Sequence, residues 1–199
     1  MKTIAVIVGS LRRESINRKL AEALEKLTAA SFTFRFVEIG DLPLYNEDLW
    51  AQPPESVLAA KLEIEASDAV LFVTPEYNRS FTPAIKNVID WGTRPWGKNS
   101  WTGKPAALIG ASPGAIGSAV GQNALKGLLP VIGLILMGQP EVYISCTAGF
   151  FDEDGNISSE NTRVFLQNWA SQFAKWIERV SAPRVEGTRG ERECIAVGS

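Results

Sequence analysis

Residues 3–19 read TIAVIVGSLRRESINRK, and this stretch sets the class of fold that the rest of the chain must complete. The apolar run from Ile4 to Val8 is typical of a strand that is buried on both faces of a parallel sheet. The run stops at Gly9, and from Ile16 onward apolar residues recur at helical spacing. The stretch therefore predicts a strand, a short polar loop and a helix, which is the repeating unit of α/β proteins.

The loop between this strand and helix is rich in hydrogen-bond donors. Ser10, Arg12, Ser15 and Asn17 lie within it or in the first helical turn. A helix N-terminus presents unpaired backbone N–H groups and the positive end of the helix dipole, so it attracts anions. Hydroxyl and guanidinium groups beside it favour a phosphate. The alternative interpretation is an ordinary loop with solvent-facing polar side chains and Ser15 as the helix N-cap.

The loop matches neither of the common nucleotide-binding motifs. It lacks the GxxxxGK[ST] pattern of P-loops and the GxGxxG pattern of dinucleotide-binding folds. Gly9 is its only glycine, so side chains must supply contacts that backbone amides supply in those motifs. This favours a terminal monophosphate over a pyrophosphate.

The composition is that of an ordinary soluble domain. The chain has 199 residues, of which 45% are hydrophobic and 21% charged, and its formal net charge is −2. This charge argues against a nucleic-acid partner, because a phosphate backbone requires a basic surface. No membrane span and no signal segment are expected, so we expect a cytoplasmic protein. Cys146 and Cys194 form no CxxC pair, so neither a disulfide framework nor a metal site is expected.

The sequence contains no histidine. This excludes Ser-His-Asp and Cys-His catalytic groups and removes the commonest ligand of transition metals. If the chain is an enzyme, either carboxylate, lysine or tyrosine side chains transfer protons, or a bound cofactor carries the reaction.

Alternating strand and helix patterns continue along the chain. Strands are predicted at 32–39, at 68–74, at 105–111 and within 134–145, where the strand is expected to begin near Glu141 or slightly earlier. Helices are predicted at 56–66, at 83–91, in the first part of 118–135 and at 158–180. Five strands separated by helices predict a doubly wound parallel sheet with helices on both faces. We expect a single domain over residues 1–180, followed by a polar tail over residues 181–199 that is either flexible or an oligomer arm.

Three loops of this sheet are expected at one edge, because ligands of open parallel sheets bind beyond the carboxyl ends of the strands. They are residues 9–17, residues 75–82 with the sequence PEYNRSFT, and residues 112–117 with the sequence SPGAIG. The second loop is expected to offer unpaired backbone N–H groups to the edge of a flat heterocycle. The two glycines of the third let the backbone approach a ligand closely. A phosphate end and a planar end together describe flavin mononucleotide (FMN), although each of the last two loops alone is equally compatible with ordinary turn chemistry.

The sequence resembles the NAD(P)H-dependent FMN reductases, a family that includes bacterial chromate and quinone reductases. The motifs that carry the resemblance are GSLRxxSxN at 9–17, PEYNxS at 75–80, KNVIDW at 86–91 and GKP at 103–105. It implies a flavodoxin-like fold with a five-stranded sheet of order 2-1-3-4-5, non-covalently bound FMN, and a homodimer or homotetramer with each flavin near a subunit boundary. Two departures from the family pattern are Thr82-Pro83, where Pro-Gly is common, and Arg79 after the PEYN motif.

The resemblance also assigns roles to the residues of the three loops. The phosphate would be held by Ser10, Arg12, Ser15 and Asn17. The flavin ring would be contacted by Pro75, Glu76, Tyr77 and Asn78, and its pyrimidine side by Ser112, Gly114 and the residues up to Gly117. No catalytic side chain is implied, because the flavin carries the hydride chemistry.

The activity that the resemblance implies is ping-pong hydride transfer from NAD(P)H through FMN to an acceptor. Quinones, flavins, azo compounds and oxyanions such as chromate are the expected acceptors. Arg79 and Arg94 are candidates for binding an anionic acceptor or the NADPH phosphate, with ordinary surface arginines as the alternative. Two other functions stay open. One is a flavodoxin-type electron carrier. Such carriers tend to be strongly acidic, so a net charge of −2 is a poor match. The other is a flavin- or nucleotide-binding regulatory module.

Two further interpretations concern single side chains. Glu76 and Asp90 could form an acid/base pair, although a structural role for Asp90 is favoured. Trp91, Trp96 and Trp101 could line a substrate channel, with a subunit contact as the favoured alternative.

Overall fold

A computed structural model describes residues 1–181 of the chain, so the predicted polar tail lies outside the described residues except for Ser181. A single parallel sheet has the order β2-β1-β3-β4-β5, and a sixth strand, β6, also pairs with β4. The strands are β1 (Lys2–Val8), β2 (Phe32–Phe36), β3 (Ala69–Val73), β4 (Pro105–Ser112), β5 (Ile135–Leu136) and β6 (Val142–Ser145). The order is the predicted one.

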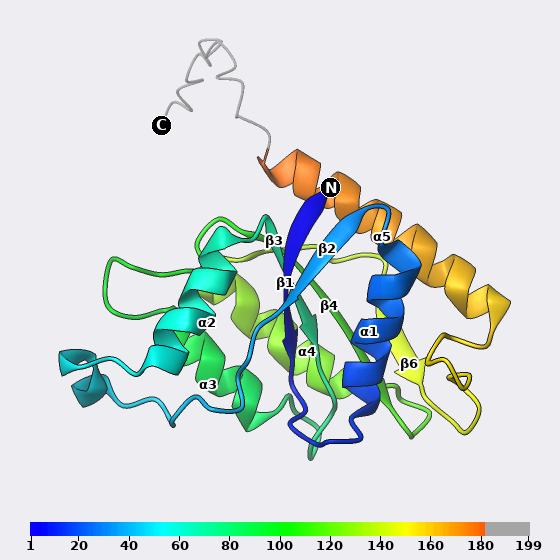
Figure 1. The fold of residues 1–199 in the computed structure, drawn as a ribbon, viewed down its shortest axis with the longest axis horizontal. Coiled ribbons are helices and arrows are strands. Elements are labelled where there is room, and N and C mark those ends of the chain that lie inside the picture. The colour runs from blue at the N-terminus through cyan, green and yellow to red at the C-terminus, as the bar shows by residue number, and fades with distance from the viewer. Residues whose placement is uncertain (182–199) are drawn as a thin grey trace, which may run out of the picture.

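Residues 1–181 also form five α-helices and two short 3-10 helices, of which all but the last α-helix connect strands. They are α1 (Ile16–Thr28), η1 (Glu47–Ala51), α2 (Glu55–Ala66), α3 (Pro83–Gly92), α4 (Ala119–Leu128), η2 (Leu129–Ile132) and α5 (Glu160–Ser181). Apolar residues of α1 and α5 pack on one face of the sheet, and those of α2, α3 and α4 pack on the other (Figure 1). The sheet is therefore covered on both faces, as predicted. Within residues 1–181, none of the helices combines the length and the apolar character that a membrane span requires.

The first strand occupies an inner position of the sheet, as its apolar run predicts. β1 pairs with β2 on one side and with β3 on the other. The side chains from Ile4 to Ile7 are fully buried, alternately against the two helical layers. Because β1 is paired with a strand on each side, its end at Val8 determines where the following loop leaves the sheet.

Side-chain caps set the beginnings of the two helices nearest the predicted site. The Ser15 hydroxyl accepts a hydrogen bond from the Arg18 backbone N–H at 3.1 Å, so Ser15 is the N-cap of α1. The Thr82 hydroxyl accepts one from the Ile85 N–H at 3.4 Å, with Pro83 in the first helical turn. The Thr82-Pro83 departure from the family pattern therefore leaves the start of α3 where the sequence predicts it.

The predicted fifth strand, beginning near Glu141, corresponds to β6, and β5 before it is an additional strand, which corrects the expected strand number. β5 pairs with the start of β4 and β6 with its end. Between the two paired segments, β4 has two residues, 107–108, whereas the outer chain has five, 137–141. The outer chain therefore contains an insertion of three residues. Pro140, which has no N–H to donate, lies in this insertion.

Two of the three tryptophans assigned to a channel or a subunit contact belong to the core. Trp91 is 1% exposed and Trp101 is fully buried, whereas Trp96 is 84% exposed. The indole N–H of Trp91 donates to the Pro43 carbonyl at 2.8 Å, and that of Trp101 donates to the Ile89 carbonyl at 3.1 Å. Because each buried indole has a partner for its one polar atom, both rings fill the interior.

Candidate flavin site

The three predicted loops surround one cavity of 230 Å³ at the carboxyl edge of the sheet, which is the lower edge in Figure 1. Residues from all three loops line it: Ser10, Arg12, Glu14, Ser15, Ile16, Asn17, Pro75, Glu76, Tyr77, Ala111, Ser112 and Pro113. The parallel strands β1, β3 and β4 end side by side, and this brings the loops together.

One end of the cavity has the features of a phosphate site. Ser15 lies directly before α1, and its hydroxyl oxygen is an acceptor for Arg18, so its O–H can donate to a ligand. Arg12 is exposed and lines the cavity, whereas the adjacent Arg13 is exposed and does not. Ser10 adds a second hydroxyl. These groups surround the N-terminus of α1, where the helix dipole favours an anion.

Glu14 places a carboxylate at the same end, which the sequence analysis missed. Its Oε2 lies 2.6 Å from Lys19 Nζ, one turn further along α1. This hydrogen bond and the charge of Lys19 hold the pKa of Glu14 below its usual value. The lysine therefore offsets the charge of the carboxylate, so the positive potential around Arg12 is largely preserved.

Asn17 lines the cavity and also connects α1 to β4 through two hydrogen bonds. Its side-chain amide donates to the Ala111 carbonyl and accepts from the Ala111 N–H, both at 2.9 Å. The pair joins the first turn of α1 to the end of β4. One N–H of the Asn17 side-chain amide remains for a ligand, so that amide can donate at most one hydrogen bond to a phosphate.

The opposite end of the cavity is bounded by a tight turn in the PEYN loop. The Tyr77 N–H donates to the Ser80 carbonyl at 2.9 Å, and the Ser80 N–H donates to the Tyr77 carbonyl at 3.0 Å. Asn78 and Arg79, between them, have positive φ values of 51° and 65°. The expectation of consecutive unpaired N–H groups is therefore wrong at Tyr77. Among residues 1–181, the N–H groups of Glu76 and Asn78 have no hydrogen-bond partner and can face a ligand.

The Glu76 carboxylate binds the N-terminus of α4. Its Oε2 accepts hydrogen bonds from the backbone N–H groups of Val120 at 3.0 Å and Gly121 at 3.1 Å. Ser118, at the N-cap position, makes no side-chain cap, so Glu76 does this from a distant loop. Burial raises the pKa of Glu76, but the hydrogen bonds from Gly121, Arg79 and Val120 outweigh it, and the pKa lies below its ordinary value.

Glu76 and Asp90 do not form the acid/base pair that was considered. Asp90 lies on α3 and pairs with Lys86 of the same helix at 2.6 Å. The Glu76 carboxylate is committed to α4 and Arg79. Asp90 therefore has the structural role that the sequence analysis favoured.

The third loop contributes less to the cavity than expected. Ser112 lines it, and its hydroxyl donates to the Gly114 carbonyl at 3.2 Å. Gly114 and Gly117 do not line it. Gly117 has a φ of 59°, and a Cβ there would lie 2.7 Å from the carbonyl carbon of Tyr143 in β6. Its glycine is thus explained by close packing on the sheet.

Neither of the two candidate substrate arginines lines the cavity. Arg79 is in the turn, where its guanidinium lies 3.1 Å from Glu76. Arg94 follows α3, which runs back from the carboxyl edge, and its guanidinium lies over the Trp96 ring at 4.9 Å. Arg94 does not line the cavity.

Residues 2–149 match the sequence model of a family described as NADPH-dependent FMN reductase. The chain belongs to this family. FMN is accordingly its cofactor and NAD(P)H its co-substrate. The function is that of an FMN-dependent reductase, and the carrier alternative is not supported.

Relatives of this FMN reductase match nearly their whole length. A 2-hydroxy-1,4-benzoquinone reductase from Burkholderia sp. is 49% identical over 174 residues, covering 87% of this chain and 95% of that protein. A quinone reductase from Pseudomonas putida is 49% identical over 177 residues, covering 88% and 95%. The solved structure of FerB, a flavoenzyme NAD(P)H:(acceptor) oxidoreductase from Paracoccus denitrificans, is 54% identical with a TM-score of 0.88, covering 90% of this chain and 98% of that one. The fold of the FMN reductase is thus flavodoxin-like, as the resemblance implied.

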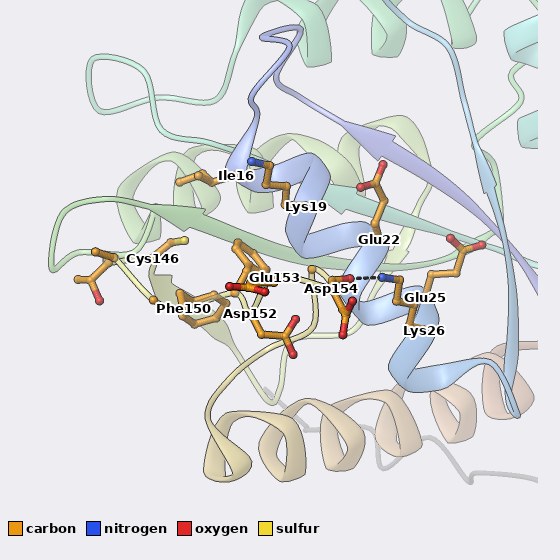
Figure 2. A pocket seen from close by; sticks show the side chains of 15 residues that line it. Ile16, Lys19, Glu22, Glu25, Lys26, Cys146, Phe150, Asp152, Glu153 and Asp154 are labelled. Atoms are coloured by element: carbon orange, nitrogen blue, oxygen red, sulfur yellow. Dashed lines mark hydrogen bonds between the residues drawn. The ribbon is translucent and has the colours of Figure 1, made fainter.

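A larger cavity of this reductase, of 810 Å³, lies between α1 and residues 146–155 (Figure 2) and shares Ile16 with the lining of the smaller one. Its acidic side chains outnumber its basic ones: Glu22, Glu25, Asp152, Glu153 and Asp154 against Lys19 and Lys26. The Lys26 ammonium also donates to the Asp154 carbonyl at 2.7 Å. This lining repels a phosphate, so the smaller cavity is the better flavin site in spite of its size.

Proposed function

We propose that this FMN reductase transfers electrons from NAD(P)H to quinones, with FMN held in the 230 Å³ cavity at the carboxyl edge of the sheet. The observation that carries the proposal is the shared lining of that cavity. The N-terminus of α1 and Arg12 supply an anion site at one end, and the PEYN turn bounds the other. This is the donor set that a flavin phosphate and a flavin ring require.

The cavity is smaller than the roughly 300–1,000 Å³ of typical small-molecule pockets. It suits the phosphate and the ribityl chain, and it leaves the ring to be held at the mouth. Arg12, Ser10 and Ser15 would bind the phosphate, with one hydrogen bond from Asn17. The backbone N–H groups of Glu76 and Asn78 would hydrogen-bond the ring edge, with Pro75 and Tyr77 beside it and Ser112 and Pro113 of the third loop on its other side.

The bound flavin supplies the hydride chemistry, and the side chains of this protein supply binding and orientation. No side chain of the cavity has to transfer a proton, which is consistent with the absence of histidine. Both substrates are expected to use the open mouth in turn, which gives ping-pong kinetics. Among the acceptors we favour quinones, because two relatives at 49% identity are quinone reductases. Flavins, azo compounds and chromate remain acceptors to be tested.

The proposal includes a homodimer or homotetramer that works in the cytoplasm. Large apolar side chains that are mostly exposed support self-association, namely those of Leu44, Trp96 and Val131. Because Arg94 does not line the cavity of its own chain, it could contact a substrate only at the flavin site of another subunit. Dependence on NAD(P)H, a metabolite of the cell interior, supports the location.

An absorbance spectrum of the purified protein tests the proposal. We expect the two visible bands of an oxidised flavin, and we expect them to bleach under anaerobic conditions when NADPH or NADH is added. A quinone added next should restore the bands without a second protein. A protein with flavin bands that NAD(P)H cannot bleach would be a carrier or a binding module, and the proposal would be wrong.

A further inference from the structure

Arg79 occupies a backbone position that usually belongs to glycine. Asn78 and Arg79 are consecutive residues with positive φ, closed by the two hydrogen bonds between Tyr77 and Ser80. This is the pattern of a type I′ turn, in which Asn-Gly is the preferred pair. Asn78 suits the first position, but a long side chain at the second is strained. Strain of this kind, beside a binding cavity, is a reason to look for a function of the side chain.

The Arg79 side chain is mostly exposed, and the position of its partner, Glu76, does not depend on the ion pair between them. The guanidinium contacts Glu76 Oε1 at 3.1 Å, and the arginine side chain is 66% exposed. Exposed ion pairs contribute little to stability. The other carboxylate oxygen of Glu76 already accepts two hydrogen bonds from α4, and the Glu76 side chain is only 10% exposed. The guanidinium can therefore leave while Glu76 and the turn stay in place.

We propose that Arg79 binds the negatively charged group of the substrate at the mouth of the flavin cavity, and that Glu76 holds its guanidinium there until the substrate arrives. This inference rests on the proposed function. In the proposed function Arg12 binds the phosphate at the other end of the cavity, and Lys19 is paired with Glu14. Arg79 does not itself line the cavity, but its guanidinium lies 3.1 Å from Glu76, which lines the end assigned to the ring. A guanidinium binds two oxygens at once, which suits a phosphate or an ionised quinone oxygen.

Two sources can supply this anionic group, and kinetics distinguish them. One is the additional phosphate that NADPH carries and NADH lacks. The other is the ionised hydroxyl of a hydroxyquinone, which is acidic because it is conjugated to a carbonyl. The O-methyl ether of the same quinone is neutral. For each variant, the ratio of kcat/KM for NADPH to that for NADH is measured, and likewise the ratio for the hydroxyquinone to its ether.

Four variants complete the experiment. Arg79→Gln should lower at least one of the two ratios by about tenfold, the effect of losing one hydrogen bond to a charged group. Arg79→Lys should restore part of the loss, because it keeps the charge. Arg79→Gly should lose the same ratio while the melting temperature does not fall, because glycine relieves the backbone strain. The matched control is Arg35→Gln, which removes an exposed arginine paired with Glu63 at 3.2 Å.

A fall in the NADPH ratio alone identifies the donor phosphate, and a fall in the quinone ratio alone identifies the acceptor; both support the inference. If Arg79→Gln leaves both ratios equal to those of Arg35→Gln, or lowers all four rates equally together with the melting temperature, Arg79 only stabilises the turn and the inference is wrong. If the wild-type protein shows no flavin reduction by NADPH or NADH, the proposed function fails before this comparison is reached.

Discussion

Arg12 and Arg13 are adjacent exposed arginines with different positions relative to the cavity. A hydrogen bond from a charged group to phosphate contributes about 1.5–3 kcal/mol. We therefore expect Arg12→Ala to raise the FMN dissociation constant by about tenfold or more, and Arg13→Ala to raise it by less than about threefold. Titration of the apoprotein with FMN, followed by flavin fluorescence, measures both. Equal effects of the two substitutions would place the phosphate elsewhere.

At the scale of single elements, α4 contains a matched pair of glycines. A Cβ on Gly121 would lie 2.9 Å from the Ser80 carbonyl oxygen, whereas a Cβ on Gly127 would meet nothing within 4 Å. Gly127→Ala should raise the free energy of unfolding by about 0.5–1 kcal/mol, because alanine is the better helix former. Gly121→Ala should lower it and weaken FMN binding, because α4 must move away from the PEYN turn. Denaturant unfolding and FMN titration of both variants test this. Equal changes in unfolding free energy and in FMN affinity for the two variants would show that α4 does not pack against the PEYN turn at Gly121.

The contact between Glu76 and α4 makes a prediction about pH. The pKa of this carboxyl is lower in the folded protein than its ordinary value of 4.5, so its ionised form favours folding. Its contribution is complete above 4.5 and is lost as the pH falls through the lowered value. At neutral pH, Glu76→Gln should reduce the free energy of unfolding by about 1 kcal/mol.

The difference between wild type and Glu76→Gln should then shrink in acid, because a protonated Glu76 resembles glutamine. Denaturant unfolding at a series of pH values, from neutral down to below the lowered pKa, measures the difference. A difference that stayed constant over this range would show that the charge of Glu76 does not stabilise α4.

At the scale of the whole molecule, flavin binding and folding are linked. A ligand at a hundred times its dissociation constant stabilises a protein by about 2.7 kcal/mol, which raises the melting temperature of a domain of this size by about 5–10 °C. FMN should produce such a shift, and riboflavin, which lacks the phosphate, a much smaller one at the same concentration. Thermal unfolding with each ligand measures the shifts. Equal shifts would contradict the phosphate end of the site.

Much of the architecture could be predicted from local sequence patterns. The apolar runs of β1, β3 and β4 and the helical spacing after Ile16 identify buried strands and covering helices. The order of the strands came from the resemblance to the family, because periodicity carries no information on order. β5 was missed because a strand of two residues is too short to show a periodic pattern, whereas β6 was predicted to begin near Glu141.

The site was predicted at the level of loops and less well at the level of contacts. The rule that ligands bind beyond the ends of parallel strands brought the three loops together correctly. The pairing of Asn17 with Ala111 spans 94 positions in sequence, and that of Glu76 with Val120 spans 44. No local sequence pattern indicates such contacts. Asn17 and Glu76 were therefore predicted only as ligand-binding residues, although their side chains also connect helices to distant segments of the chain.

The division of the outer strand into β5 and β6 bears on how this protein avoids self-aggregation. An uninterrupted strand at the margin of a sheet is a template on which another chain can add its own backbone. Here that margin offers runs of only two and four residues, separated by an insertion that contains a proline. Deleting residues 138–140 would join the two runs, and the protein would become prone to precipitate at high concentration.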